Sequence, residues 1–384
     1  MQTAARTGRR KGATISVATL VVACLLLAAA VLTACRSNQS EPLALVTPGP
    51  PLPARPGANV WVVGLPDLVL ASADGGSSWK VAHQGKITDA SLGDLWSVVF
   101  GDADHGWAVE RGGESSPTKI LATGDGGATW SWQYPGPRGK LLAVAASDAS
   151  HAWAVGYSGT SAPVSGRSTG LMLATSDGGA IWKQQPIPPH IDLYDVAFGD
   201  ARHGWALGAG ADQSTYFVLS MIDGGAHWRV SYKTKVGHLS RLACSGTRRC
   251  WVVGSTPLLA GKQSGYLAAT SDGGRHWRSD RSVSTSPLCD VSFPDVLHGW
   301  AVGPLGAILA THDGGTTWAA QHTDGRFNLQ AVAFSDAAHG WALISHMALL
   351  ATGNGGRTWS VVRPTGTRGG YLAALACFGS GTGK

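Results

Sequence analysis

The stretch LATSDGGAIW (173–182) places an aspartate between a hydroxyl residue and two glycines, with a tryptophan five residues further on. The same pattern occurs seven times along the chain, at spacings of 41 to 52 residues. A period of this length indicates a repeat architecture. The aspartate column of the seven copies comprises Asp74, Asp125, Asp177, Asp223, Asp272, Asp313 and Asn354.

A second motif alternates with the first. FGDADHGWAV (100–109) recurs around Trp153, Trp205, Trp300 and Trp341, and with altered flanks around Trp61 and Trp251. An apolar run such as LWSVVF (95–100) comes before it, and short β-rich runs bounded by Gly and Asp turns indicate strands. No window shows helical periodicity. Seven units of four strands predict an all-β fold, a seven-bladed β-propeller with four-stranded antiparallel blades, over residues 59–384.

The two ends of the chain predict how the ring closes. The first unit begins at the WVVG strand (61–64) and lacks an apolar first strand, whereas YLAALACF (371–378) is left over at the C-terminus. Pairing of this last strand with the N-terminal blade would close the ring and remove a free sheet edge.

The repeated turns resemble the Asp-box, or bacterial neuraminidase repeat. The alternation of DGGxTW with HGWAVG resembles the photosystem II stability/assembly factor-like propellers. This resemblance implies a role in handling a membrane protein or its precursor tail, through a basic surface patch. It specifies the fold more narrowly than the function, because Asp boxes occur in propellers of unrelated activity.

The Asp-box aspartates are interpreted as turn-forming residues. A carboxylate in such a turn can accept bonds from backbone N–H groups and a hydroxyl, and the glycines permit positive φ. Asn354 loses the charge, and Met221 replaces the hydroxyl residue in the fourth copy, which a catalytic set would not tolerate. Most histidines fall in the same repeated turns, so no metal site and no cofactor are expected.

The N-terminus indicates an extracytoplasmic location. Basic residues 9–11 precede an apolar run, residues 15–34, that ends in LTAC with Cys35. This pattern predicts a lipoprotein signal peptide over 1–34 with lipidation of Cys35, followed by a Pro-rich tether over 35–58. An uncleaved membrane anchor is the alternative, since 20 apolar residues can span a bilayer. Both place the propeller outside the cytoplasm, attached to the bacterial cell membrane.

The charge balance indicates which class of partner fits the chain, and the cysteine positions predict a disulfide. The net charge is +6, but residues 1–34 hold four Lys/Arg and no acid, which leaves 26 basic against 24 acidic residues. That balance does not favour nucleic acid. Cys244 and Cys250 flank one strand-to-strand turn, LACSGTRRCW (242–251), and an oxidising compartment predicts a disulfide between them.

Binding residues are expected on the face opposite the DGG turns, where the sequence is most irregular. The segments that lead into the innermost strands there are rich in basic and aromatic residues, which suits an anionic or peptide partner. A solvated rim without a partner is the alternative. The candidates are Trp132, Tyr134, Arg138, Lys140, Tyr232, Lys233, Lys235, Arg326, Phe327, Arg363 and Arg368.

Three charged residues deviate from a column of small residues on the innermost strands: Asp195, Arg241 and Asp290. Buried charges near one another are normally paired. The cluster is expected either to lock the inner strands together or to form the floor of an axial pocket.

Catalysis is not expected. The chain has only three Glu residues, and Asp192 and Asp212 have no matched second carboxylate of the kind that glycoside hydrolysis requires. The sequence therefore predicts a monomeric, membrane-anchored binding or scaffold propeller with a protein partner near the membrane. A carbohydrate-binding protein or sialidase-like glycoside hydrolase of the cell envelope is the alternative.

Overall fold

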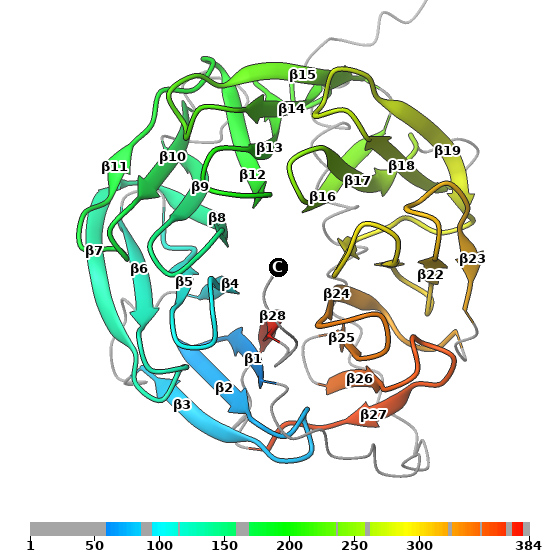
Figure 1. Ribbon diagram of the computed structural model, residues 1–384, viewed down its shortest axis with the longest axis horizontal. Coiled ribbons are helices and arrows are strands. Elements are labelled where there is room, and N and C mark those ends of the chain that lie inside the picture. The colour runs from blue at the N-terminus through cyan, green and yellow to red at the C-terminus, as the bar shows by residue number, and fades with distance from the viewer. Residues whose placement is uncertain are drawn as a thin grey trace, which may run out of the picture.

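The computed structural model describes residues 59–85, 94–113, 116–158, 169–235, 237–257, 262–321, 325–345, 348–365 and 371–378. These residues form strands and turns, without helix, and make seven four-stranded antiparallel sheets around a central axis (Figure 1). The chain is thus a seven-bladed β-propeller, and the prediction from the repeat count is confirmed.

Each blade runs from an innermost strand at the axis to an outermost strand at the rim. The innermost strands are β28 (Leu372–Phe378), β4 (Leu95–Phe100), β8 (Lys140–Ala146), β12 (Ile191–Phe198), β16 (His238–Ser245), β20 (Asp290–Ser292) and β24 (Leu329–Phe334). The second strands are β1 (Asn59–Gly64), β5 (Gly106–Glu110), β9 (Ala152–Ser158), β13 (Gly204–Gly210), β17 (Arg249–Ser255), β21 (Gly299–Val302) and β25 (Gly340–Ile344).

The outer half of each blade follows in the same order. The third strands are β2 (Leu68–Ser72), β6 (Pro117–Thr123), β10 (Thr169–Thr175), β14 (Tyr216–Met221), β18 (Gly265–Thr270), β22 (Ile308–Thr311) and β26 (Ala348–Thr352). The outermost strands are β3 (Lys80–Gln84), β7 (Ser131–Arg138), β11 (Lys183–Gln184), β15 (Arg229–Thr234), β19 (Arg278–Ser284), β23 (Ala319–Ala320) and β27 (Ser360–Val362).

The ring closes as the ends of the chain predict. In blade 1 the last strand, β28, pairs antiparallel with β1, in a register that sets Val60 opposite Cys377. The sheet order is β28-β1-β2-β3, so the first and last strands of the propeller share one blade. Blades 2 to 7 each take four consecutive strands, from β4–β7 to β24–β27.

The core lies between blades, where aliphatic side chains surround stacked aromatic rings. Trp153, on the second strand of blade 3, stacks on Phe198 of blade 4 with ring centroids 3.5 Å apart. Phe198 in turn meets the edge of Trp228, which follows the Asp box of blade 4. Three other blade junctions repeat this arrangement, so both repeated tryptophan columns serve packing between neighbouring blades.

Two faces result from the up-and-down course of the strands. One bears the turn between the innermost and second strands and the Asp-box turn between the third and outermost strands; we call it the Asp-box face. In blade 2 these two turns are joined by a bond from the Gly126 N–H to the Asp104 carbonyl, and blades 3 to 7 repeat it. The opposite face, the loop face, bears the other connections. The chain enters β1 at Asn59 and leaves β28 at Phe378, both on the Asp-box face.

Candidate functional site: two binding faces and an axial charge cluster

The Asp-box turns have one shared geometry. In blade 2, Asp125 Oδ1 accepts hydrogen bonds from the Thr129 N–H and the Thr123 hydroxyl, each at 2.8 Å, and Oδ2 accepts from the Thr129 hydroxyl at 2.6 Å. The buried N–H of Gly127 donates to Thr123 Oγ1. Gly127 has φ +81°, and a Cβ there would lie 2.6 Å from Trp61 Nε1. Only glycine fits this close approach of the turn to the neighbouring blade.

These hydrogen bonds leave the carboxylates no proton to exchange near neutral pH. Bonds from the Thr129 hydroxyl and N–H and from the Thr123 hydroxyl lower the pKa of Asp125 to about 2. The pKa values of Asp74, Asp177, Asp223, Asp272 and Asp313 are also lowered. Asn354 keeps the bonds to Thr352 and Thr358 without a charge. The aspartates therefore stabilise turns, and a general-acid role does not fit them.

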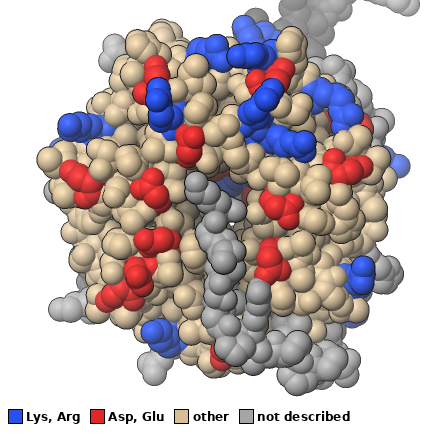
Figure 2. Space-filling view, viewed as in Figure 1, with Lys and Arg blue, Asp and Glu red and all other residues tan. Residues whose placement is uncertain are grey.

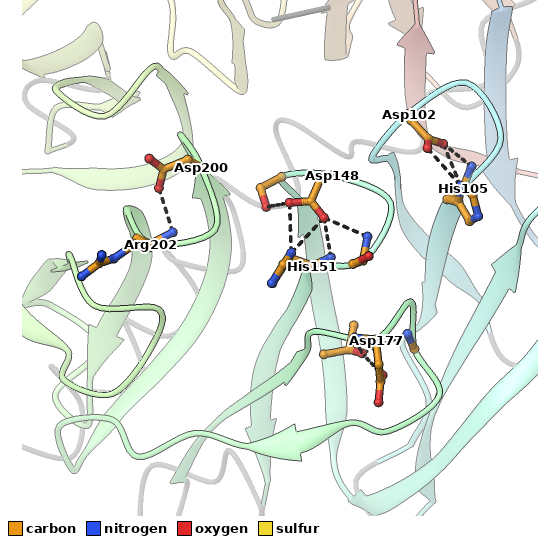
Figure 3. Close-up of polar contacts among 11 residues, drawn as sticks. Asp102, His105, Asp148, His151, Asp177, Asp200 and Arg202 are labelled. Atoms are coloured by element: carbon orange, nitrogen blue, oxygen red, sulfur yellow. Dashed lines mark hydrogen bonds and ion pairs between the residues drawn. The ribbon is translucent and has the colours of Figure 1, made fainter.

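The turns between innermost and second strands contain a second repeated pair, an aspartate and the histidine three residues later. Asp148 Oδ1 accepts from the N–H groups of Ser150 and His151 and lies 2.9 Å from His151 Nδ1 (Figure 3). Burial raises the pKa of Asp148, but these bonds outweigh it and the net shift is downward. Blades 2, 4, 6 and 7 repeat the pair. The D-x-x-H spacing in FGDADHGW was the sequence signal for this Asp–His pair. In the structure the pair forms another turn.

The axial cluster connects innermost strands of neighbouring blades. Asp195 Oδ2 accepts from the Leu242 N–H of the next blade at 2.8 Å, and Asp290 Oδ2 accepts from Val332 N–H at the same distance. Ser97 Oγ receives the equivalent bond from Val144 N–H in blade 3. The column thus supplies acceptors between blades, which favours the interpretation that the charges lock the inner strands.

Arg241 lies between the two carboxylates in blade order, and its guanidinium donates to the Ser240 carbonyl. Burial raises the pKa of Asp195 and raises that of Asp290 to about 7, while the Arg241 charge opposes both shifts. For Asp290, the Asp195 charge adds to the upward shift. The Arg241 charge thus acts on the pKa of both carboxylates. Their Oδ2 atoms accept hydrogen bonds from backbone N–H groups of the neighbouring blades.

The loop-face candidates are placed differently from the sequence expectation. The segments that lead into the innermost strands of blades 3 and 5, 131–140 and 229–238, lie largely in the outermost strands β7 and β15 of blades 2 and 4. Trp132, 42% exposed, and Tyr134 therefore lie on an outermost strand at the rim. The same holds for Tyr232, whose hydroxyl bonds to that of Tyr266, and for Lys233. Pairing of a fourth strand leaves its side chains at the rim rather than at a loop tip.

Basic side chains of blades 2 to 4 lie over aromatic rings. Lys119 Nζ is 5.4 Å from the Trp132 ring centre, Lys140 Nζ 5.7 Å from Tyr157 and Lys233 Nζ 5.5 Å from Phe217. Arg111 lies 4.5 Å from the Trp96 ring centre. Such contacts hold the cations against the surface. Lys119 Nζ also pairs with Glu110 Oε2 at 3.0 Å.

The remaining candidates divide into exposed and buried residues. Arg138, Arg326 and Arg363 are exposed, whereas Phe327 is 6% exposed and packs in the core of blades 6 and 7. Phe327 therefore does not present its ring to a partner, because it fills the space beneath the segment leading into β24. Lys235 is exposed, 3.9 Å from Asp212 Oδ2.

Asp212 and Asp192 are the two carboxylates that the sequence left without a matched second acid. Asp212 accepts from the N–H groups of Ser214 and Thr215 and from the Thr215 hydroxyl. Burial opposes the shift, but these bonds lower its pKa to about 2. Asp192 is buried at the start of β12 near Tyr194, which donates to Gln213 Oε1.

Cys244 and Cys250 form a disulfide across the β16–β17 hairpin, with Cα atoms 4.1 Å apart. Cys35 and Arg368 lie outside the described residues, as does the apolar run 15–34. Within the described ranges, no helix has the length and apolarity to cross a membrane. The same ranges hold no cluster of three or more His, Cys, Asp or Glu side chains that could bind a metal ion.

The fold and its turns define the class of protein: a seven-bladed β-propeller made of Asp-box (BNR) repeats. Residues 271–366, about a quarter of the chain, match the PSII_BNR family model, described as photosynthesis system II assembly factor YCF48. Over these residues the chain is similar to that family, in agreement with the resemblance that its two motifs predict. No curated protein matches the chain.

Solved structures with a similar fold are distant in sequence. YCF48 from Cyanidioschyzon merolae is 17% identical, with a TM-score of 0.55, and the match covers 77% of this chain and 98% of that one. A structure described as YCF48 bound to D1 peptide is 18% identical, with a TM-score of 0.52 and coverage of 71% and 83%. A putative 6-phosphogluconolactonase from Bacteroides uniformis is 10% identical, with a TM-score of 0.53 and coverage of 84% and 100%. At these identities the likeness shows the fold alone.

Proposed function

We propose that this chain is a non-catalytic, extracytoplasmic scaffold propeller, anchored to the membrane, that binds a protein partner and assists the assembly or stability of a membrane protein complex. The family-model match and the peptide complex of the similar YCF48 structure support a binding role. Membrane anchoring rests on the sequence of residues 1–35.

The observation that carries the proposal is the composition of the loop face and its rim. Lys140 and Lys233 lie over aromatic rings, as does Lys119, which also pairs with Glu110. Arg138 is exposed on the connection that leads to Lys140, and Arg363 is exposed on the connection that leads into β28. Fixed aromatic rings with adjacent cations offer apolar contact and charge together, which suits a peptide segment carrying carboxylates. The aspartates of the Asp boxes and of D-x-x-H turns are occupied in turn geometry, so hydrolysis has no free acid and base there.

The test is crosslinking in intact cells followed by affinity purification of the full chain. We expect one membrane protein or assembly intermediate to be recovered, and its yield to fall at least tenfold when Arg138, Lys233 and Arg363 are all changed to Glu. The control is Lys80→Glu with Arg357→Glu, two charge reversals at exposed basic residues on the Asp-box face, which should leave recovery unchanged. Equal loss in both variants, or recovery of envelope glycan with no protein, would overturn the proposal.

A further inference from the structure

The Asp-box face is not uniform in charge. Figure 2 shows this face, and Lys and Arg side chains gather over β12–β19, whereas Asp and Glu predominate on the side of β4–β7. The turns and outermost-strand starts of blades 4 and 5 hold six basic residues, Arg202, Arg229, Arg248, Arg249, Arg275 and Arg278, against three acids, Asp200, Asp223 and Asp272. Equivalent positions of blades 7, 1 and 2 hold two basic residues, Lys80 and Arg357, against five acids, Asp74, Asp102, Asp104, Asp125 and Asp336.

Two of the arginines, Arg202 and Arg248, occupy a position that the turn uses only through its backbone. In each blade from 2 to 7, the carbonyl of this residue accepts the bond from the first Asp-box glycine. That position holds Asp104 and Ser150 in blades 2 and 3, but Arg202 and Arg248 in blades 4 and 5. Figure 3 shows the Arg202 side chain extending away from the Asp200 carboxylate. That carboxylate accepts a hydrogen bond from the Arg202 backbone N–H. Folding therefore does not require arginine at these positions.

Exposed apolar side chains flank the arginines on the same face. Leu297 in blade 6 takes the position of Arg202 and Arg248 and is 47% exposed, beside Val296 at 43%. Ile181 and Ile222, in the Asp-box turns of blades 3 and 4, are 57% and 54% exposed. The position of Ile181 holds serine, threonine or histidine in the other six Asp boxes. Large apolar groups at turn tips beside cations are typical of a surface that meets the lipid–water interface.

The hairpin that carries Arg248 and Arg249 is held rigid. Cys244 and Cys250 pair across it, and Arg249 donates to the Val296 carbonyl of blade 6 at 3.0 Å. Blade 5 also lacks the aspartate of the D-x-x-H turns, because Gly246 and Thr247 occupy this stretch. The hairpin thus presents two cations without the acid that accompanies the equivalent turn elsewhere.

We propose that this sector, defined as the arginines of blades 4 and 5 with Ile181, Ile222, Val296 and Leu297, docks the propeller on an anionic lipid bilayer. The chain enters β1 at Asn59 on the same face, so an attachment preceding Asn59 joins the propeller on this face. The docking orients the loop face away from the bilayer and toward a partner. It does not depend on lipidation or on the partner proposed above.

Vesicle co-sedimentation of the chain from Asn59 onward tests the proposal, since every described strand of the seven sheets lies between Asn59 and Phe378. We expect binding to vesicles of phosphatidylglycerol and phosphatidylcholine in equal parts, weak binding to phosphatidylcholine alone, and release by salt. Arg202→Gln, Arg248→Gln and Arg275→Gln together should weaken the binding on the order of 100-fold, at roughly fivefold per cation.

A second triple variant separates charge from apolar insertion. Ile181→Ser, Ile222→Ser and Leu297→Ser should weaken binding by about tenfold or more while leaving the charge unchanged. The matched control, Arg138→Gln, Lys233→Gln and Arg363→Gln, removes three cations of the loop face and its rim and should sediment like the unmodified chain. All altered side chains are exposed, and unchanged melting temperatures will verify folding. Equal binding to neutral and anionic vesicles, absence of binding, or equal loss in the control would overturn the proposal.

Discussion

The carboxylate of Asp195 accepts a hydrogen bond at 2.8 Å from the backbone N–H of Leu242, which belongs to the innermost strand of the next blade. Asp290 and Ser97 make the same contact with Val332 and Val144. A propeller has little covalent connection between blades, so side-chain acceptors of this kind join sheets that otherwise meet through packing. The two carboxylates near the axis therefore have a structural role, because they join neighbouring blades.

Replacing Asp195 tests this contact. Asp195→Ala leaves the buried Leu242 N–H without its acceptor, and we expect the free energy of unfolding to fall by about 1–3 kcal/mol. Asp195→Asn retains an acceptor oxygen and should preserve most of the stability. Chemical denaturation of both variants provides the measurement, and an Ala variant as stable as the unmodified chain would show that the contact is dispensable.

Stability should depend on pH through Asp290. Burial raises the pKa of this carboxyl from 3.8 to about 7, against the opposing charge of Arg241. A raised pKa in the folded state means that the stabilising contribution is complete below pH 3.8 and is lost as pH rises to about 7. We therefore expect the unmodified chain to lose stability over this interval relative to Asp290→Asn, whose side chain does not titrate. Denaturation midpoints measured across the interval check the sign; parallel pH profiles for the two proteins would refute it.

The Asp-box hydroxyl should matter more than the exposed hydroxyl that shares its aspartate. Thr123→Val leaves the buried Gly127 N–H unpaired, for an expected loss of about 1–3 kcal/mol in the free energy of unfolding. Thr129→Val removes a solvent-exposed donor to Asp125, and we expect a change of only about 0.5 kcal/mol. Urea denaturation distinguishes the two, and equal losses would contradict the assignment of the Thr123 hydroxyl as the central acceptor of the turn.

The sequence was sufficient for the ring because its repeats fix both turn chemistry and core packing. Glycines and hydroxyl residues at constant spacing predict the Asp-box turns. The two tryptophan columns predict two buried positions in each blade, one in the second strand and one directly after the Asp-box turn. Closure by residues 371–378 followed from counting strands, and β28 pairs with β1 as expected. Local chemistry repeated seven times leaves few alternative folds.

The lengths of the outermost strands and the positions of the candidate binding residues were harder to predict from the sequence. An outermost strand pairs along one edge only, so no periodic apolar pattern marks where pairing stops. β7 spans eight residues and β11 only two, although they hold equivalent places in blades 2 and 3. This is why Trp132, expected on the face opposite the DGG turns, lies on an outermost strand at the rim, and why the burial of Phe327 was missed. The asymmetry of the Asp-box face depends on comparing turn tips around the ring, which needs their spatial positions.

The Cys244–Cys250 disulfide provides the last prediction. The pair closes a short hairpin loop, with six residues of sequence separation, and should stabilise the fold by about 2 kcal/mol by restricting the unfolded chain. Cys244→Ser with Cys250→Ser should therefore lower the free energy of unfolding by that amount. Because the hairpin presents Arg248 and Arg249, the same variant should also weaken binding to anionic vesicles, by less than removal of the arginines does. Peptide mass spectrometry without reduction checks the bond, and free thiols at both positions would refute it. An intact bond whose loss alters stability but not vesicle binding would mean that the hairpin keeps its arginines in place through the Arg249 contact to Val296 alone.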